Sequence, residues 1–350
     1  MPRTIGAFVF PTIWQDWSLN EADRFLRSLR DFGVNTIATE SETYRDDLIE
    51  LAHRLGLRFV GGIACFSEHG RNNQPLHDQP ELWPILETGE RRPLMEWYIG
   101  VTPTIEVYRE ARLDEITRIV RDHDLDGLCL DFIRWPLHWE LELRPGQPEP
   151  LQSSFDPYTI QHFLAFAGLE LPADATTTPS QAAWILREHR AVWTDFKCRT
   201  ITTFVSAARQ RIQVVRGRDT ELGVYLVPAL DAQRAYLVGQ RAADLAQVTD
   251  FLSPMVYHPV LHRTPAWIKE TVDEMILLTP GKVLPVLQVD SAEGAVFNSD
   301  WGLPVPVDEW RAAACAAAQR QDTLGLVAFT GTALFADGRG EILLQCLSEH

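Results

Sequence analysis

The sequence has few cysteines, no long hydrophobic run and too few basic residues to balance its acids. Its five cysteines are scattered over 350 residues, without a C-x-x-C pair or a cluster with histidines. We therefore expect no structural zinc site, no disulfide framework and no metal or other cofactor. No window approaches the roughly 18 apolar residues of a membrane span. The first apolar stretch lacks a signal-peptide cleavage site, so no membrane partner and a cytoplasmic location are expected.

Acidic residues clearly outnumber basic ones. The chain has 48 Asp and Glu against 32 Lys and Arg, which gives a formal net charge of −16. A surface with this excess of negative charge argues against nucleic acid or an anionic membrane as the main partner. Nothing in the composition indicates an oligomeric state.

Short apolar segments alternate with amphipathic helical segments along the whole chain. Several helical segments end at a glycine, such as Gly33 and Gly56, before the next apolar segment begins. We expect strands at residues 5–10, 34–38, 57–63, 126–131, 222–227, 251–257, 283–289 and 324–330. Eight strands with helices between them close a barrel. The predicted fold is therefore α/β, a single (β/α)8 TIM barrel over residues 1–350.

Two long connections interrupt this alternation. Residues 65–103 form a polar loop after the third strand, and a proline-rich stretch follows the fourth. We expect residues 137–180 to be an irregular insertion over the C-terminal face of the barrel. Long loops inside a compact domain usually carry function.

The fourth expected strand ends in a carboxylate, Asp131, and Arg134 follows three positions later. In this type of barrel the active site lies at the C-terminal ends of the strands. A carboxylate there is costly to bury unless it has a partner or a function. A structural ion pair with Arg134 is the alternative, but the position favours a catalytic role. Other residues expected at strand ends are Glu40, Glu68, Asp231, Tyr257, His258, Gln288 and Asp290.

Two carboxyl groups in different protonation states are what the cleavage of a glycosidic bond requires. Asp131 is the expected nucleophile or stabilising carboxylate, kept ionised by Arg134. Glu40, Asp231 or Asp290 is expected to donate the proton, and spacing along the chain does not rank them. Asp231 has an alternative role as a helix N-cap, and Asp290 as a turn residue.

Aromatic and polar side chains share the strand ends and the nearby loops. Sugars present apolar ring faces and hydroxyl groups, which suit this mixture. We therefore expect a small carbohydrate or oligosaccharide as the partner. The residues expected to contact it are Arg134, Tyr257, His258, Gln288, Glu68, Trp14, Trp97 and Trp135.

Three segments carry a family resemblance. Residues 126–136 read Asp-Gly-Leu-Cys-Leu-Asp-Phe-Ile-Arg-Trp-Pro, and residues 250–259 read Asp-Phe-Leu-Ser-Pro-Met-Val-Tyr-His-Pro. Both resemble strand motifs of uncharacterised glycoside-hydrolase-like TIM-barrel families, which are related to the glycosyl-hydrolase-10-like and α-amylase-like groups. Residues 284–288 are similar to another of their strands, with Val286 where tryptophan is common. The resemblance implies a carbohydrate-active barrel with Asp131 in its site.

Three functional hypotheses follow from these patterns. The first is a glycoside hydrolase, expected to retain anomeric configuration. The second is a sugar-binding or regulatory barrel without hydrolysis, which is favoured if no carboxyl lies within roughly 10 Å of Asp131. The third is a metal-dependent sugar lyase or isomerase, with Glu40, Asp131, His258 and Asp290 as ligands.

Overall fold

The structure is a computed structural model that describes residues 3–217, 220–290, 301 and 304–348. Its strands are β1 (Thr4–Phe8), β2 (Thr36–Ala38), β3 (Arg58–Ala64), β4 (Gly127–Asp131), β5 (Glu221–Leu226), β6 (Phe251–Pro254), β7 (Val286–Gln288) and β8 (Gly325–Phe329). They form an 8-stranded sheet in the order β6-β5-β4-β3-β2-β1-β8-β7, and all neighbours are parallel. Parallel bridges from Leu252 to Val283 and from Met255 to Val286 bring the outer strands together. This nearly closed ring confirms the predicted (β/α)8 TIM barrel.

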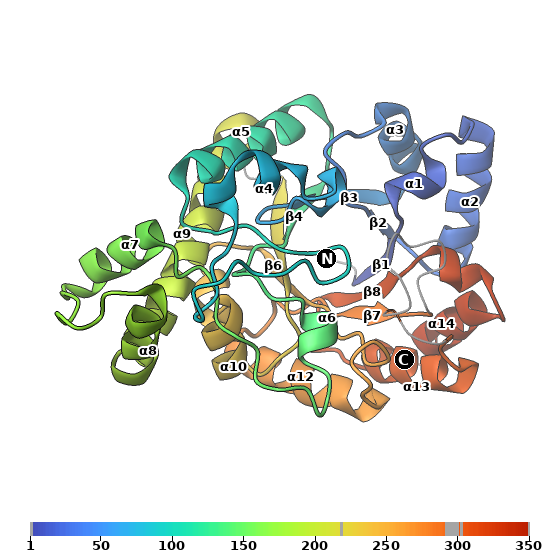
Figure 1. Cartoon of the computed structure of the whole chain (residues 1–350). Helices are drawn as coiled ribbons and strands as arrows, with labels where there is room; N and C mark the ends of the chain where they lie inside the picture. The colour runs from blue at the N-terminus through green and yellow to red at the C-terminus, as the bar shows by residue number, and fades with distance from the viewer. Residues whose placement is uncertain (1–2, 218–219, 291–300, 302–303, 349–350) are drawn as a thin grey trace.

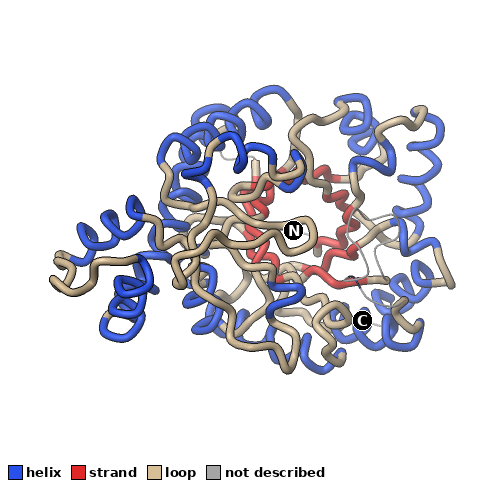
Figure 2. The backbone as a smooth tube through the Cα atoms, in the orientation of Figure 1, coloured by secondary structure: helices blue, strands red, loops and turns tan. Residues whose placement is uncertain are grey.

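Helices surround the ring of strands (Figure 1), which forms the centre of the molecule (Figure 2). They are α1 (Pro11–Trp14), α2 (Leu19–Asp31), α3 (Asp46–Arg54), α4 (Gln74–Asp78), α5 (Glu106–Asp122), α6 (Trp139–Glu142), α7 (Pro157–Ala167), α8 (Thr178–Glu188), α9 (Arg190–Arg216), α10 (Asp231–Val238), α11 (Ala242–Leu245), α12 (Pro265–Leu278), α13 (Val307–Ala318) and α14 (Arg339–Ser348). Side-chain caps define where several of them begin; Ser18 and Glu21, for example, form a capping box at α2. Among the described helices, none is both long enough and apolar enough to cross a membrane.

Side chains along each strand alternate between two cores. In β4, Leu128 belongs to the core shared with the helices, whereas Cys129 belongs to the core inside the barrel. Asp131 lies two positions after Cys129 and therefore points inward at the end of the strand. Glu40 stands in the same relation to Ala38 of β2, which also packs inside the barrel. Alternation alone thus directs both carboxyls toward the barrel axis.

The segment after β4 contains the helix α7 and a shorter helical turn, α6. Asp156 caps α7 by accepting a 2.9 Å hydrogen bond from the N–H of Thr159. In Figure 1, α7 and α8 extend away from the barrel beside α9. Of these helices, α6 is the one whose described residues, Trp139 and Glu140, line the large cavity at the strand ends.

A disulfide joins Cys315 of α13 to Cys346 of α14. The expectation of no disulfide framework is therefore wrong at this pair. Separated by 31 positions, the two cysteines meet because the helices pack together, with a Cα–Cα distance of 4.7 Å. Chain spacing alone carries no signal of such packing. The expected cytoplasmic location stays a prediction.

We predict that replacing both cysteines, Cys315→Ser with Cys346→Ser, lowers the free energy of unfolding. A cross-link that closes a loop of this length contributes about 3–4 kcal/mol by restricting the unfolded chain. Denaturant unfolding without reductant measures the loss. Reductant should destabilise the wild-type protein toward the level of the double variant and leave that variant unchanged. Equal stability of all samples would contradict a formed disulfide.

Candidate active site

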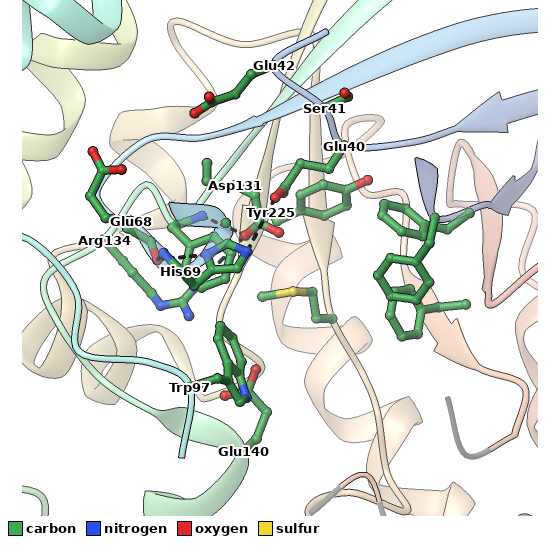
Figure 3. A pocket seen from close by; sticks show the side chains of 18 of the residues that line it. Glu40, Ser41, Glu42, Glu68, His69, Trp97, Asp131, Arg134, Glu140 and Tyr225 are labelled. Atoms are coloured by element: carbon green, nitrogen blue, oxygen red, sulfur yellow. Dashed lines mark hydrogen bonds and ion pairs between the residues drawn. The ribbon is translucent and has the colours of Figure 1, made fainter. Parts of the chain in front are cut away.

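A cavity of about 520 Å³ lies at the C-terminal ends of the strands (Figure 3). Its acidic lining residues are Glu40, Glu42, Glu68, Asp131 and Glu140. Cavities of this size accommodate small-molecule ligands. The position agrees with the general placement of active sites in TIM barrels.

The turn after β4 is strained and brings Arg134 back toward Asp131. Phe132 has a φ of 47°, in the left-handed region that bulky residues rarely adopt. Its N–H donates a 2.6 Å hydrogen bond to Asp131 Oδ1, and Arg134 Nη1 lies 3.7 Å from the same oxygen. The guanidinium carbon of Arg134 lies 4.5 Å from the centre of the Phe132 ring. Strain of this kind concentrates at functional sites, where the surrounding structure maintains it.

Glu40 and Asp131 form a hydrogen-bonded pair of carboxyl groups. Burial, and next the negative charge of Asp131, raise the pKa of Glu40 well above its ordinary value. Burial also raises the pKa of Asp131, but Arg134, the Phe132 N–H and the hydrogen bond from Glu40 oppose that increase. We infer that Glu40 holds the proton and donates it to an ionised Asp131, since two adjacent carboxyls do not both ionise readily.

His69 adds a neutral ring beside this pair. Burial is the main cause that lowers the pKa of His69 to about 4, so the ring is uncharged at neutral pH. Its Nδ1 lies 2.8 Å from Ser67 Oγ, and its Nε2 lies 3.9 Å from Glu40 Oε1. The imidazole centre is 4.5 Å from the centre of the Phe132 ring. Packing therefore holds His69 against the carboxyl pair without adding a charge.

Glu140 is a further buried carboxyl in the cavity and was not among the residues predicted from the sequence. Its side chain is 7% exposed. Burial raises the pKa of Glu140 to about 7, and the charge of Arg134 opposes this increase. In the view of Figure 3, Glu140 and Glu40 lie on opposite sides of Asp131. The cavity therefore holds a carboxyl that is half protonated near neutral pH.

Ion pairs anchor the segments that carry these carboxyls. Glu142 of α6 pairs with the buried guanidinium of Arg92. Glu68, which lines the cavity as predicted, accepts hydrogen bonds of 2.9 Å from both Tyr108 Oη and Arg112 Nη2. Side chains of Glu68 and Arg112 are almost fully buried, so this network is structural as well as part of the wall.

The structure brings half of the predicted site residues together and places the others elsewhere. Those that line the cavity are Glu40, Glu68, Trp97, Asp131, Arg134 and Tyr257. Trp97 is half-buried, and its ring lies 5.1 Å from the ring of His69. A position this close to the carboxyl pair is compatible with the expected stacking on a sugar.

Asp231 and Asp290 do not line the cavity. Asp231 Oδ1 accepts hydrogen bonds from Arg234 Nη2 at 2.6 Å and from the N–H of Ala242 at 2.8 Å. Asp290 pairs with Arg339 at 2.9 Å and accepts from the N–H of Val305 at 2.7 Å. Both carboxylates connect neighbouring segments of backbone. The expectation that either one donates the catalytic proton is corrected accordingly.

Trp14 and Trp135 also lie outside the large cavity. Trp14 is 4% exposed and stacks on Phe59, with ring centres 6.0 Å apart. Trp135 is 1% exposed, packs against Trp193, and donates a 3.2 Å hydrogen bond from Nε1 to the carbonyl of Lys197. Both rings fill the core between strands and helices, so the sugar-stacking role predicted for them is corrected.

His258 and Gln288 are buried behind the cavity wall. His258 Nε2 lies 3.0 Å from Glu309 Oε1, and burial lowers the pKa of His258 to about 4. Gln288 Oε1 accepts from the N–H of Val260 at 3.3 Å. Because Asp290 and His258 have these separate partners, the ligands of the metal hypothesis do not converge. Within the described residues, no group of three or more His, Cys, Asp or Glu could hold a metal ion.

Comparisons with known proteins identify the fold. No family model matches the sequence, and no curated protein sequence matches it. The glycoside hydrolase domain of PgaB (BpsB) from Bordetella bronchiseptica superposes with a TM-score of 0.72 at 12% identity, over 99% of both chains. A β-galactosidase from the psychrophilic Marinomonas ef1 gives 0.62 at 11% identity, over 93% of this chain and 54% of that chain. The α-L-fucosidase isoenzyme 2 from Paenibacillus thiaminolyticus gives 0.60 at 14% identity, over 99% and 49%.

These similarities show a TIM barrel of the kind found in glycoside hydrolase domains. At such low identities they show the fold and leave the catalytic mechanism open. The chain spans about half the length of the galactosidase and fucosidase chains. Membership of the specific families that the strand motifs resemble stays a prediction.

We predict that Glu140→Gln stabilises the protein more at pH 8 than at pH 5. The folded pKa of about 7 lies above the ordinary value of 4.5. The contribution of Glu140 to the free energy of unfolding is therefore fully present below pH 4.5 and is lost as the pH rises through about 7. The gain from the substitution should be roughly 2–3 kcal/mol larger at pH 8 than at pH 5.

Urea unfolding at the two pH values measures this difference. Glu149→Gln is the control, because the Glu149 side chain is 72% exposed in the same segment of the chain. The control should show no such dependence on pH. A gain for Glu140→Gln that is the same at both pH values would contradict the raised pKa.

Proposed function

We propose that the chain is a glycoside hydrolase in which Asp131 is the catalytic carboxylate and Glu140 is the general acid. One observation carries this proposal: the same cavity contains a carboxylate paired with a cation and a buried carboxyl with a pKa of about 7. Glycosidic cleavage needs two carboxyl groups in these different states. The structural similarity to glycosidase barrels supports a carbohydrate substrate.

Glu40, an acid candidate from the sequence, suits a different role. It is hydrogen-bonded to Asp131, so the two carboxyl groups are in direct contact. Retaining pairs stand about 5–5.5 Å apart, and inverting pairs about 6.5–9.5 Å. A sugar does not fit between two groups in direct contact. Glu40 therefore donates a hydrogen bond that orients Asp131, and Glu140 on α6 is left as the general acid.

We propose retention of anomeric configuration, with Asp131 attacking the anomeric carbon. The groups that surround Asp131, namely Arg134, Glu40 and the Phe132 N–H, fix the orientation that a nucleophile requires. As the bond from that carbon to the leaving oxygen breaks, Glu140 donates a proton to the oxygen. Water, which gives a proton to Glu140, then attacks the anomeric carbon and displaces Asp131. The anomer released first, detected by proton NMR, distinguishes retention from inversion.

The binding-only alternative receives less support. It was favoured on condition that no carboxyl lay within roughly 10 Å of Asp131 across the pocket, whereas Glu140 lines the same cavity and the charge of Asp131 contributes to its raised pKa. A barrel that only binds sugars also gains nothing from a carboxyl held near neutral pKa, because burying that group costs stability. Both features support hydrolysis as the proposed activity.

We predict that the loss of activity caused by Glu140→Gln depends on the leaving group of the substrate. A screen of nitrophenyl glycosides first identifies the sugar. For the methyl glycoside of that sugar, kcat/KM should fall by about 100- to 10,000-fold, because the leaving oxygen needs a proton. For the 2,4-dinitrophenyl glycoside the fall should be less than about tenfold, because that anion leaves without protonation. Equal losses on both substrates would argue against Glu140 as the acid.

We also predict that wild-type activity on the methyl glycoside declines as the pH rises through about 7, where Glu140 loses its proton. The Glu140→Gln variant should lack this alkaline decline, and Glu149→Gln should retain it.

Asp131→Asn should lose activity on both leaving groups with unchanged circular dichroism. Normal turnover by Asp131→Asn would rule out the proposed role of Asp131.

A further inference from the structure

The cavity has a second, apolar half that the proposed chemistry does not use. Its charged groups come from β2, β3, β4 and the segments that follow them. The other wall comes from β1, β6 and β8 and from neighbouring positions. Its side chains are Phe8, Phe10, Met255, Tyr257, Trp301 and Phe329.

The rings of this apolar half pack on one another around Phe329. Ring-centre distances from Phe329 are 5.1 Å to Phe8, 5.5 Å to Phe10, 4.9 Å to Tyr257 and 5.3 Å to Trp301. Mutual packing of this kind holds the rings in fixed orientations. The surface is therefore preformed, and a ligand does not have to order it on binding.

This wall is poorly suited to a second sugar. Four of its six side chains offer little to a hydroxyl group: Phe8, Phe10 and Phe329 have no hydrogen-bonding atoms, and Met255 has only a weak thioether acceptor. The Tyr257 hydroxyl and the Trp301 indole N–H are the strong hydrogen-bonding groups of this wall. A sugar ring has hydroxyl groups around its whole edge. Burying them against such a wall without partners is unfavourable. A group with few hydroxyls gains from the same contact, because it removes apolar surface from water.

The border between the two halves lies where the proposed acid is. Tyr257 packs 5.8 Å from the ring of Trp139, and Glu140 is the next residue on α6. Asp131, Glu140 and Tyr257 line the same cavity, and after burial the charges of these two carboxyls are the next causes that raise the pKa of Tyr257. A leaving oxygen protonated by Glu140 therefore lies at the edge of the apolar wall.

We propose that the aromatic half is an aglycone site for an aryl or long alkyl group, joined to a sugar that occupies the charged half. This inference rests on the proposed hydrolase function for the reaction, but the apolar site itself does not depend on turnover. The substrates would be aryl or alkyl glycosides rather than chains of sugars. For the sugar that is cleaved, the n-octyl glycoside should exceed the methyl glycoside by about 100-fold in kcat/KM.

The test uses a neutral fluorescent probe, N-phenyl-1-naphthylamine, with the whole chain. The wild-type protein should bind the probe, and n-octyl glycosides should displace it at concentrations where methyl glycosides do not. Phe10→Ala removes a half-buried ring from the wall and should weaken probe binding at least tenfold. Phe329→Leu, which keeps an apolar side chain, should weaken it less.

Phe166→Ala is the matched control, because Phe166 is 43% exposed on α7 and does not line the cavity. It should bind the probe like the wild type. No probe binding, equal binding by Phe10→Ala, or equal displacement by methyl and octyl glycosides would overturn the aglycone site. Probe binding without hydrolysis of any glycoside would support the apolar site and overturn the proposed function. Hydrolysis of methyl and octyl glycosides at equal rates would support the proposed function and overturn the aglycone site.

Discussion

The negative charge of Asp131 at the end of β4 determines how the groups around it are arranged. An isolated carboxylate in a buried cavity is strongly unfavourable, so cations and hydrogen-bond donors must surround it. Arg134 reaches it because the strained turn at Phe132 folds the chain back. Glu40 reaches it because the order of the sheet places only β3 between β2 and β4, and alternation turns both side chains inward. Burial, and next the charge on Asp131, keep the proton on Glu40.

The same cavity concentrates groups that are unfavourable for stability. Glu140 and Glu40 have raised pKa values because burial disfavours their ionised forms. The surrounding barrel offsets this cost with two apolar cores and with buried ion pairs such as that of Glu68 and Arg112. Proteins commonly accept lower stability at sites whose chemistry requires strained or shifted groups. Destabilised carboxyls beside an ordered aromatic wall form a site prepared for a ligand with a polar and an apolar part.

Local signals in the sequence were sufficient for the fold and for half of the predicted site residues, Asp131 among them. Alternation of apolar strands and amphipathic helices predicted the barrel, and the position at the end of a buried strand singled out Asp131. The choice among Glu40, Asp231 and Asp290 depends on distances across the barrel, which spacing along the chain does not contain. Inward alternation from the end of its strand would have favoured Glu40. Glu140 lies in a short turn without periodicity, so only the three-dimensional structure reveals it.

Protonation of the carboxyls is the central claim, and neutron diffraction from deuterium-exchanged crystals at pH 6 tests it most directly. We expect a deuteron on Glu40 that points to Asp131, a second deuteron on most copies of Glu140, and none on Asp131. That result would place one charge and one acid in the cavity, as the proposed chemistry requires. A deuteron on Asp131 with bare carboxylates at Glu40 and Glu140 would contradict the account.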